Sequence, residues 1–208
     1  MRISLWILVV AWIGAKACAA PTVLTFDDLS PGTILSGGMY ADLIWEDGNA
    51  GLLGFPGKWV VPPSANSHPF SQPHNLINGN GSTLMGVSFP SPVDLQGAYV
   101  AVQGNDSVSW AQSLVAHGYF GGLPTADTPL FTQITTAPTW FDMKALMHVD
   151  RIVFEASVSF QNMAGYGLDD LTFTYVPEPA GISLGLLGLG GLLLRRRGGV
   201  LGAAGGCS

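Results

Sequence analysis

The clearest pattern in the chain is an alternation of apolar and polar positions within short segments, which predicts β-strands. In residues 150–160 the apolar side chains of Ile152, Phe154, Ala156, Val158 and Phe160 occupy every second position. Every second side chain of a strand points to the same face, so these residues would line a core. Similar segments, alternating or rich in β-branched and aromatic residues, span 22–26, 40–45, 83–89, 98–103, 108–116, 130–135 and 171–175.

Clusters of glycine, proline and asparagine separate these segments. Pro31-Gly32, Gly37-Gly38, Asn78-Gly79-Asn80-Gly81 and Gly121-Gly122 are typical of turns. Sustained helical periodicity is absent, apart from one turn expected around residues 140–147. The eight or nine short strands predict an all-β fold, an antiparallel β-sandwich of the jelly-roll kind. Residues 54–75 are irregular, and a loop of this length is usually functional or mobile.

The N-terminal segment predicts a cleaved secretory signal peptide. Arg2 precedes an apolar run over residues 3–15, and the small residues Ala17-Cys18-Ala19 follow. These match the charged, hydrophobic and cleavage regions of such a peptide, and the A-x-A rule places the cut after Ala19. Acylation of Cys18 as a lipoprotein is the alternative, although Ala15-Lys16-Ala17 is a poor lipobox. We therefore assign residues 1–19 to a signal peptide.

The C-terminal region carries three features in order. Val176-Pro177-Glu178-Pro179 comes first, and its prolines lack backbone donors and hold the chain extended. An uncharged run rich in Leu and Gly covers residues 180–194, and Arg195-Arg196-Arg197 would then stay on the cytoplasmic side of a membrane. At about 1.5 Å per residue this run would reach about 22 Å, short of the ~30 Å hydrocarbon core. It therefore predicts a short transmembrane helix that acts as a temporary membrane handle.

This arrangement over residues 176–197 resembles the PEP-CTERM sorting signal of exported bacterial proteins. The resemblance implies an exosortase, a membrane protease-transpeptidase, as a partner. It also implies transient attachment to the inner membrane and release to the cell surface or extracellular matrix of a Gram-negative bacterium. Residues 198–208 depart from the family pattern, because its signal usually ends within a few residues of the arginines. An ordinary C-terminal anchor and a buried apolar helix are the alternatives.

The body between these signals, residues 20–175, is strongly acidic. It has three basic residues, Lys58, Lys144 and Arg151, against thirteen acidic ones, a formal net charge of −10. Such a surface repels phosphate backbones, so we expect no nucleic-acid partner, whereas cation binding is compatible with it. Both cysteines, Cys18 and Cys207, lie in segments that we expect to be removed. The mature protein would therefore lack a cysteine nucleophile or a thiolate metal site.

Two acidic pairs bracket the body. Leu24-Thr25-Phe26-Asp27-Asp28-Leu29 stands near its start, and residues 166–173, Tyr-Gly-Leu-Asp-Asp-Leu-Thr-Phe, stand at its end. These motifs resemble the bracketing strands of β-sandwich modules in exported proteins. Those modules are similar to galactose-binding-like jelly rolls and carbohydrate-binding modules. The resemblance implies a fold more than an activity.

The four bracket aspartates, Asp27, Asp28, Asp169 and Asp170, are the candidate metal ligands. The first and last strands of a jelly roll commonly lie close, which would bring these carboxylates into one region. Four like charges need a counter-cation, and Ca²⁺ suits carboxylates and strand-end carbonyls. A structural Ca²⁺ near the chain ends is frequent in the modules that the body resembles. The alternative is that the four aspartates cap turns and face water.

Aromatic side chains are the usual platforms for sugars, because the C–H face of a pyranose packs on an indole or a phenol. Trp59, beside the irregular loop, and Trp45, followed by Glu46-Asp47, are the candidates for such a platform. Trp110 is expected in the core. Solvent-facing indoles at positions 45 and 59 would indicate a ligand, whereas buried ones would indicate a scaffold. The other available aromatic residues are Trp140, Tyr40, Tyr119 and Phe120.

We therefore expect an exported, non-enzymatic β-sandwich that binds extracellular polysaccharide or serves a structural role, with no cofactor other than Ca²⁺. Dispersed acids favour binding over catalysis. One alternative is an extracellular glycan-active enzyme, which predicts a cleft with a carboxylate of raised pKa. The other is a purely structural matrix or biofilm component, which predicts self-association through edge strands.

Overall fold

The computed structural model describes residues 19–49, 55–63, 68–103, 110–158 and 163–177. Within these ranges every regular element is a β-strand, and the strands pair antiparallel. The prediction of an all-β antiparallel fold is therefore confirmed. Residues 20–176 form one compact unit.

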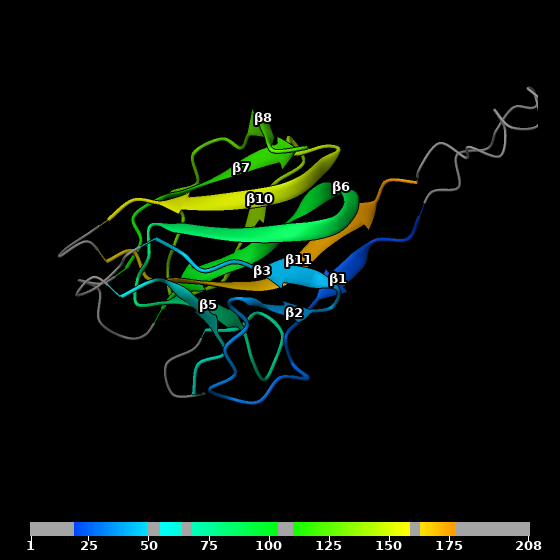
Figure 1. Ribbon diagram of the computed structural model, residues 1–208. Coiled ribbons are helices and arrows are strands. Elements are labelled where there is room, and N and C mark those ends of the chain that lie inside the picture. Colours follow the sequence, from blue (N-terminus) through cyan, green and yellow to red (C-terminus); the bar gives the residue numbers. More distant parts are fainter. Residues whose placement is uncertain (1–18, 50–54, 64–67, 104–109, 159–162, 178–208) are drawn as a thin grey trace, which may run out of the picture. The chain divides into compact units, whose positions relative to one another are not determined.

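Eleven strands follow one another along the described chain (Figure 1). They are β1 (Thr22–Leu24), β2 (Gly38–Tyr40), β3 (Leu43–Trp45), β4 (Lys58–Val60), β5 (Leu76–Gly79), β6 (Leu84–Val102), β7 (Leu114–Phe120), β8 (Leu123–Asp127), β9 (Thr139–Asp142), β10 (Val149–Ala156) and β11 (Tyr166–Tyr175).

The long strand β6 belongs to both layers of a sandwich. Its first half, as far as Ser88, pairs with β3 and with most of β10, and its second half, from Val93, pairs with β11 and β9. Val93, at the junction, also pairs with Val149 at the start of β10. Pro90 and Pro92 stand between the halves, where they remove two backbone donors from the ladder. Figure 1 shows β6 curving from one group of strands into the other.

The two halves of β6 define the layers. The first layer contains β2, β3, the first half of β6, β10, β7 and β8. The second layer contains β4, β5, β11, the second half of β6 and β9, and β1 lies along the same side of β11 as β5. The chain crosses repeatedly between the layers, so segments distant in sequence lie side by side.

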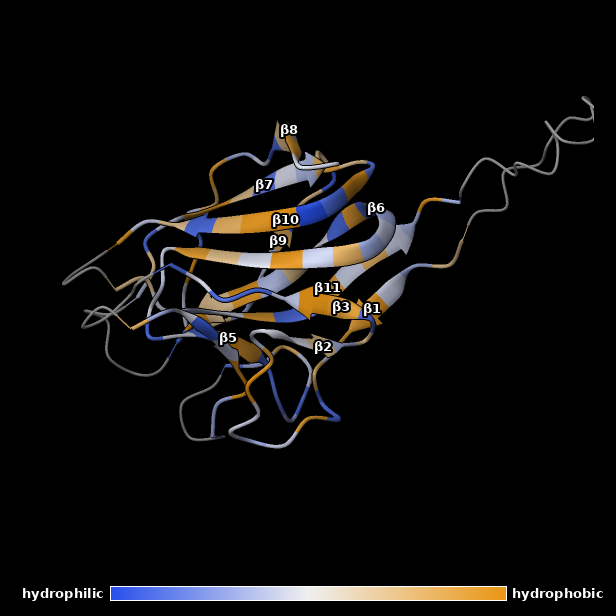
Figure 2. Ribbon diagram, viewed as in Figure 1, coloured by the Kyte–Doolittle hydropathy of each residue, from blue (hydrophilic) through white to orange (hydrophobic). Residues whose placement is uncertain are grey.

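Aromatic rings from both layers fill the space between them. Trp59 of β4 packs edge to face against Trp45 of β3 and Phe154 of β10, with centroid distances of 5.6 and 6.0 Å. Phe89 of β6 meets Phe173 of β11 at 5.2 Å. These contacts join strands of different layers, so the core lies between the sheets. Figure 2 shows hydrophobic and hydrophilic blocks along β10, whose buried residues include Ile152 and Phe154.

Several predicted elements are confirmed and others are corrected. Gly121 and Gly122 form the turn between β7 and β8 with φ angles of 57° and 79°, which suit the two-residue hairpin loop that the sequence indicates. The segment 40–45, predicted as one strand, is broken by Ala41-Asp42, whose φ angles are 51° and 62°. It therefore contributes to two strands, β2 and β3, joined as a hairpin.

Two further expectations concern residues 130–147. Residues 130–135 do not form a strand, because Phe131 makes only an isolated bridge to Leu114. The turn expected around residues 140–147 is shorter than that range: residues 139–142 form β9 against β6, and the chain then turns at residues 143–146, where the Leu146 N–H donates to the Met143 carbonyl at 2.9 Å. Pairing with a long neighbouring strand decides the conformation there, whatever the local sequence prefers.

Candidate functional site

Three aromatic side chains form a continuous strip on the outer surface of the second layer. Tyr99 of β6 stands opposite Trp140 of β9 in the strand register, and their ring centroids are 5.2 Å apart. Phe70, from the segment before β5, stacks on Tyr99 with centroids 3.4 Å apart. Ala98 and Val100, on either side of Tyr99, are fully buried, so the tyrosine points away from the core. We call Phe70, Tyr99 and Trp140 the aromatic strip.

The indole of Trp140 lies over Gly97 in the neighbouring strand. A Cβ atom at residue 97 would be 2.5 Å from Cζ2 and 2.7 Å from Cε2 of that indole, so the ring rests on the glycine backbone. Trp140 is 37% exposed and Phe70 is 50% exposed. An aromatic face that is supported by a sheet and open to solvent is suited to stacking against a sugar ring.

A hollow of about 300 Å³ opens beside the strip. It is lined by Trp140, Phe141 and Asp142 of β9 and by residues 129–133. Within the latter segment, Leu130 presents exposed apolar surface and Gln133 an exposed amide. The hollow thus combines apolar side chains with hydrogen-bonding groups in similar measure.

The loop of residues 68–75, which we call the capping loop, carries Phe70 and is anchored by Asp169. The Asp169 carboxylate accepts hydrogen bonds from the backbone N–H groups of Phe70 and Ser71, both at 2.8 Å, and from the Ser71 hydroxyl at 3.1 Å. Asp169 also pairs with Tyr99 in the register of β11 and β6. Asp169, Tyr99 and Trp140 therefore form one row across three strands.

Burial dominates the ionisation of Asp169. The residue is 2% exposed, and burial together with the charge of Asp170 raises the pKa of its carboxyl from 3.8 to about 7, although hydrogen bonds from Ser71 act in the opposite direction. A carboxyl of raised pKa is the feature that the glycan-active enzyme alternative predicts. Both oxygen atoms of the Asp169 carboxyl, however, accept hydrogen bonds from the protein itself, mostly from the capping loop.

The other bracket aspartates also make contacts within the body. Strand β1 pairs with β11, so the first and last strands are adjacent, as predicted. Asp27 accepts a hydrogen bond from the backbone N–H of His74 at 3.2 Å, near the end of the capping loop. Asp28 accepts one from the Tyr40 hydroxyl at 2.6 Å, and burial together with this bond raises the pKa of Tyr40. Both ends of the capping loop are thus held by aspartates from the two brackets.

Two observations at the bracket aspartates speak against a Ca²⁺ site, and one nearby speaks for it. Asp170 accepts a hydrogen bond from the Ser71 hydroxyl at 3.0 Å, so each bracket aspartate already has a partner in the protein. The described residues contain no group of three or more His, Cys, Asp or Glu side chains placed to hold a metal. In the capping loop, Oδ1 of Asn75 is buried without a hydrogen-bond partner, and an amide oxygen is a ligand that Ca²⁺ accepts. A structural Ca²⁺ stays a prediction.

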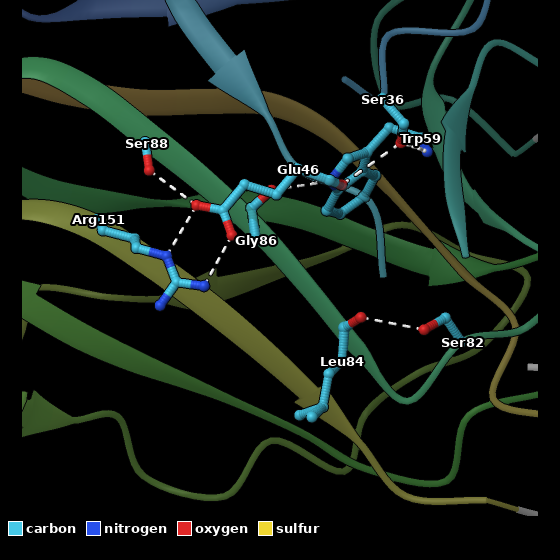
Figure 3. A network of polar contacts seen from close by, with 8 residues as sticks. All are labelled: Ser36, Glu46, Trp59, Ser82, Leu84, Gly86, Ser88 and Arg151. Atoms are coloured by element: carbon cyan, nitrogen blue, oxygen red, sulfur yellow. Dashed lines mark hydrogen bonds and ion pairs between the residues drawn. The ribbon is translucent and has the colours of Figure 1, made fainter. Parts of the chain in front are cut away.

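The prediction that Trp45 and Trp59 form a sugar platform is wrong. Both residues are 0% exposed. Nε1 of Trp59 donates a hydrogen bond to the backbone carbonyl of Gly86 at 3.0 Å, which fixes the indole inside the core (Figure 3). Trp45 alternates with the exposed Ile44 in β3, so its side chain points inward. The indoles at positions 45 and 59 therefore belong to the scaffold.

A separate polar cluster lies on the first layer (Figure 3). Glu46, directly after β3, accepts hydrogen bonds from Nε and Nη2 of Arg151 in β10 at 2.7 and 2.6 Å, and from the Ser88 hydroxyl in β6 at 2.7 Å. The Arg151 guanidinium lies 5.2 Å from the ring centroid of Tyr119 in β7. Burial of Glu46 opposes its ionisation, but the hydrogen bonds from Arg151 and Ser88 outweigh it and lower the pKa of Glu46. The cluster ties these strands together.

His117 of β7 forms a second tie across the same layer. Its Nδ1 lies 2.7 Å from Asp127 of β8, and its Nε2 lies 3.0 Å from Glu155 of β10. Through these two contacts His117 joins β8 and β10 across β7.

The predicted targeting segments lie almost entirely outside the described residues. The structure describes neither residues 1–18 nor residues 178–208, so the signal peptide and the residues of the sorting signal from Glu178 to Arg197 are not among those that can be examined. Pro177, the first proline of that signal, is exposed. In the described part of the chain no helix has the length and apolar character needed to cross a bilayer.

Comparison with known proteins gives weak likenesses in structure alone. Neither a protein-family model nor a curated protein matches the chain. The chain is similar to the CBM51-2 and INT domains of Clostridium perfringens ZmpB in complex with GlcNAc, with a TM-score of 0.35 and 10% identity over 76% of this chain. It spans 32% of that protein. It is also similar to CBM51 from C. perfringens GH95 in complex with methyl-galactose, with a TM-score of 0.27 and 12% identity over 74% of this chain and 100% of that one. Likenesses this weak assign no family.

Sequence reasoning missed Phe70 and Tyr99, and it named Trp140 only among the available aromatic residues. Tyr99 could have been found, because it interrupts the run of small and β-branched side chains Ala98, Val100 and Ala101 with a large aromatic group. An aromatic residue at an outward position of a strand is a signal for a binding surface. The contribution of Phe70 could not have been found, since it depends on the fold of the capping loop.

Proposed function

We propose that the body is a non-catalytic glycan-binding module of the galactose-binding-like, jelly-roll kind, and that the aromatic strip is its binding surface. The observation that carries this proposal is the strip itself, which is supported by the sheet and borders the hollow. The C–H face of a pyranose would stack on the exposed indole of Trp140. The side chains of Asp142 and Gln133 would supply hydrogen bonds to sugar hydroxyl groups.

The size of the hollow supports a small ligand or one unit of a longer chain. Its volume of about 300 Å³ is at the lower end of the range for ligand sites. The strip extends beyond it, through Tyr99 to Phe70, whose ring is half exposed. We therefore infer that one sugar unit occupies the hollow against Trp140 and that a further unit continues over the strip.

Binding is a better explanation than catalysis for the acidic groups near this surface. Glycoside hydrolysis requires two carboxyl groups that flank the scissile bond. Asp169, the carboxyl of raised pKa, is almost fully buried, and both of its oxygen atoms accept hydrogen bonds within the protein. It supports the surface from below and has no access to a substrate.

The proposed location of this activity rests on the two terminal segments of the sequence. We propose that residues 1–19 direct export and that the signal over residues 176–197 delivers the protein, through an exosortase, to the cell surface or extracellular matrix. A glycan-binding body would then meet exopolysaccharide where it is released. A structural Ca²⁺ at the bracket aspartates would stabilise the capping loop and, through it, the strip.

The experiment is a glycan-array screen of the protein and of three alanine variants. Trp140→Ala and Phe70→Ala remove exposed parts of the strip, and we expect each to weaken binding at least about tenfold, roughly 1.4 kcal/mol. Phe120→Ala is the matched control, because Phe120 is also exposed, at 42%, but lies at the end of β7 in the first layer.

The outcomes separate the alternatives. Binding that is lost in the strip variants and kept in Phe120→Ala supports the proposal. Equal loss in all three variants, or in none, contradicts the assignment of the surface. If no glycan binds at all, while the purified protein self-associates, the structural alternative is favoured.

A further inference from the structure

Each lysine and arginine side chain of the body forms an ion pair with an aspartate or a glutamate. No lysine or arginine other than Lys58, Lys144 and Arg151 stands between residues 20 and 176. The ion pairs are Lys58–Asp47 at 2.7 Å, Arg151–Glu46 at 2.6 Å and Lys144–Asp142 at 3.7 Å. An anionic ligand would therefore have to compete with an internal carboxylate for every lysine or arginine of the body.

The charge near the aromatic strip is acidic as well. Asp142 lines the hollow next to Trp140, and Asp170 lies against the capping loop at Ser71. Lys144 forms an ion pair with Asp142 of the hollow, and Asp142 balances its charge. Arg151 and its partner belong to the first layer, and Lys58 belongs to β4, at the opposite edge of the second layer from β9.

We infer that the aromatic strip selects glycans without anionic groups and discriminates against uronic acids and sulfated sugars. This inference rests on the proposed function and specifies its ligand class. A carboxylate on a sugar stacked against Trp140 would lie close to Asp142, and no unpaired lysine or arginine would compensate for it. At the protein surface one such repulsion lowers affinity about fivefold. The net charge of the body, −10, adds a long-range repulsion that salt screens.

The test compares pairs of hexose oligosaccharides that differ only in oxidation of the C6 hydroxyl to a carboxylate, with the full chain as the binding protein. We expect the uncharged member of each bound pair to bind about fivefold more tightly at an ionic strength of about 0.02 M, and the difference to narrow at about 0.3 M. Calcium is chelated in one series, because a bound divalent cation would bridge an acidic sugar to the protein.

Two variants locate the effect. Asp142→Asn removes the acid beside the hollow and frees Lys144, so we expect the preference for uncharged sugars to fall by about twofold or more. Asp47→Asn makes the same change in charge and frees Lys58 at the opposite edge of the layer, so it controls for net charge. Equal effects of the two variants would overturn the role of Asp142.

The remaining outcomes distinguish a failure of the inferred ligand class from a failure of the proposed glycan-binding function. If carboxylated sugars bind as tightly as uncharged ones, and Trp140→Ala abolishes both, the ligand class is wrong while glycan binding stands. If neither form binds in any condition, the proposed function itself fails.

Discussion

Replacing Asp169 with alanine tests whether one buried carboxyl holds the capping loop, and with it Phe70, in place. The substitution removes the acceptor for three loop donors, the N–H groups of Phe70 and Ser71 and the Ser71 hydroxyl. A hydrogen bond of this kind contributes about 0.5–1.5 kcal/mol net, so the three together amount to about 2–4 kcal/mol. We expect this loss of unfolding free energy at pH 5, where the folded protein holds Asp169 protonated.

The same variant should change the pH dependence of stability. The pKa of Asp169 is about 7 in the folded protein and 3.8 as the ordinary value, so the folded state binds more protons between these limits. Unfolding free energy therefore falls as the pH rises through this window. Between pH 5 and pH 8 the fall amounts to at most about 2.6 kcal/mol. The unfolding free energy of Asp169→Ala lacks this pH dependence. The difference in unfolding free energy between the wild type and the variant should therefore be smaller at pH 8 than at pH 5.

The assay is urea unfolding at pH 5 and pH 8, followed by the fluorescence of the buried tryptophans. Asp170→Asn is the comparison variant, because Asp170 accepts a single loop hydrogen bond and an asparagine tolerates its φ of 49°. It also removes a charge that helps to raise the pKa of Asp169, so we expect it to reduce the pH dependence without abolishing it, since burial is the larger cause. Hydrogen exchange at the amides of Phe70 and Ser71 reports on the loop directly. A penalty for Asp169→Ala that is as large at pH 8 as at pH 5 would show that the hydrogen bonds outweigh burial and that Asp169 is ionised throughout.

Three further predictions concern the strip, the core and the metal. Gly97→Ala should weaken glycan binding, because the new Cβ would meet both the Trp140 indole and the backbone carbonyl of Phe141 in β9; the array screen measures this, and unchanged binding would refute the close packing of β9 on Gly97. Trp59→Ala should lower the unfolding free energy by about 3–5 kcal/mol, since it empties a fully buried site, and a loss below about 1 kcal/mol in urea unfolding would contradict that role. If Ca²⁺ binds at the bracket aspartates, the thermal midpoint should rise with Ca²⁺, fall with a chelator and stop responding in Asp28→Ala, whereas an unchanged midpoint would exclude the site.

Strands could be predicted from the sequence where one face is buried and the other is exposed to solvent. In β10 the buried residues Ile152, Phe154 and Ala156 alternate with exposed or half-exposed ones, and this alternation is visible in the sequence. Strand β8 could not be predicted in this way, because nearly all of it is exposed and it depends on pairing with β7. Strand β4 has only three residues, too few to display a period.

The candidate site could be predicted only in fragments. The sequence places Asp169 beside a strand and identifies a long irregular segment before residue 75, but nothing in it indicates that the two meet. Phe70 and Asp169 are 99 positions apart in the chain and come together through the pairing of β5 with β11. Trp59 was expected to be exposed because it lies near that irregular segment. Trp59 is buried because β4 packs against Trp45 and Phe154 of the first layer, and the local sequence does not encode this packing.

In the sequence, the bracket aspartates and the aromatic strip are separate features. In the structure, Asp169 and the strip are joined by one chain of contacts. Asp169 holds Phe70 by its backbone, Phe70 stacks on Tyr99, and Tyr99 contacts Trp140 at the edge of the hollow. A change at Asp169 would therefore reach the proposed glycan-binding surface through three contacts in a row. Ligand stacking on Trp140 would in turn restrain the strip and, by linkage, stabilise the capping loop. The hydrogen exchange of the Phe70 amide should slow when glycan binds, because that amide donates its hydrogen bond to the buried Asp169.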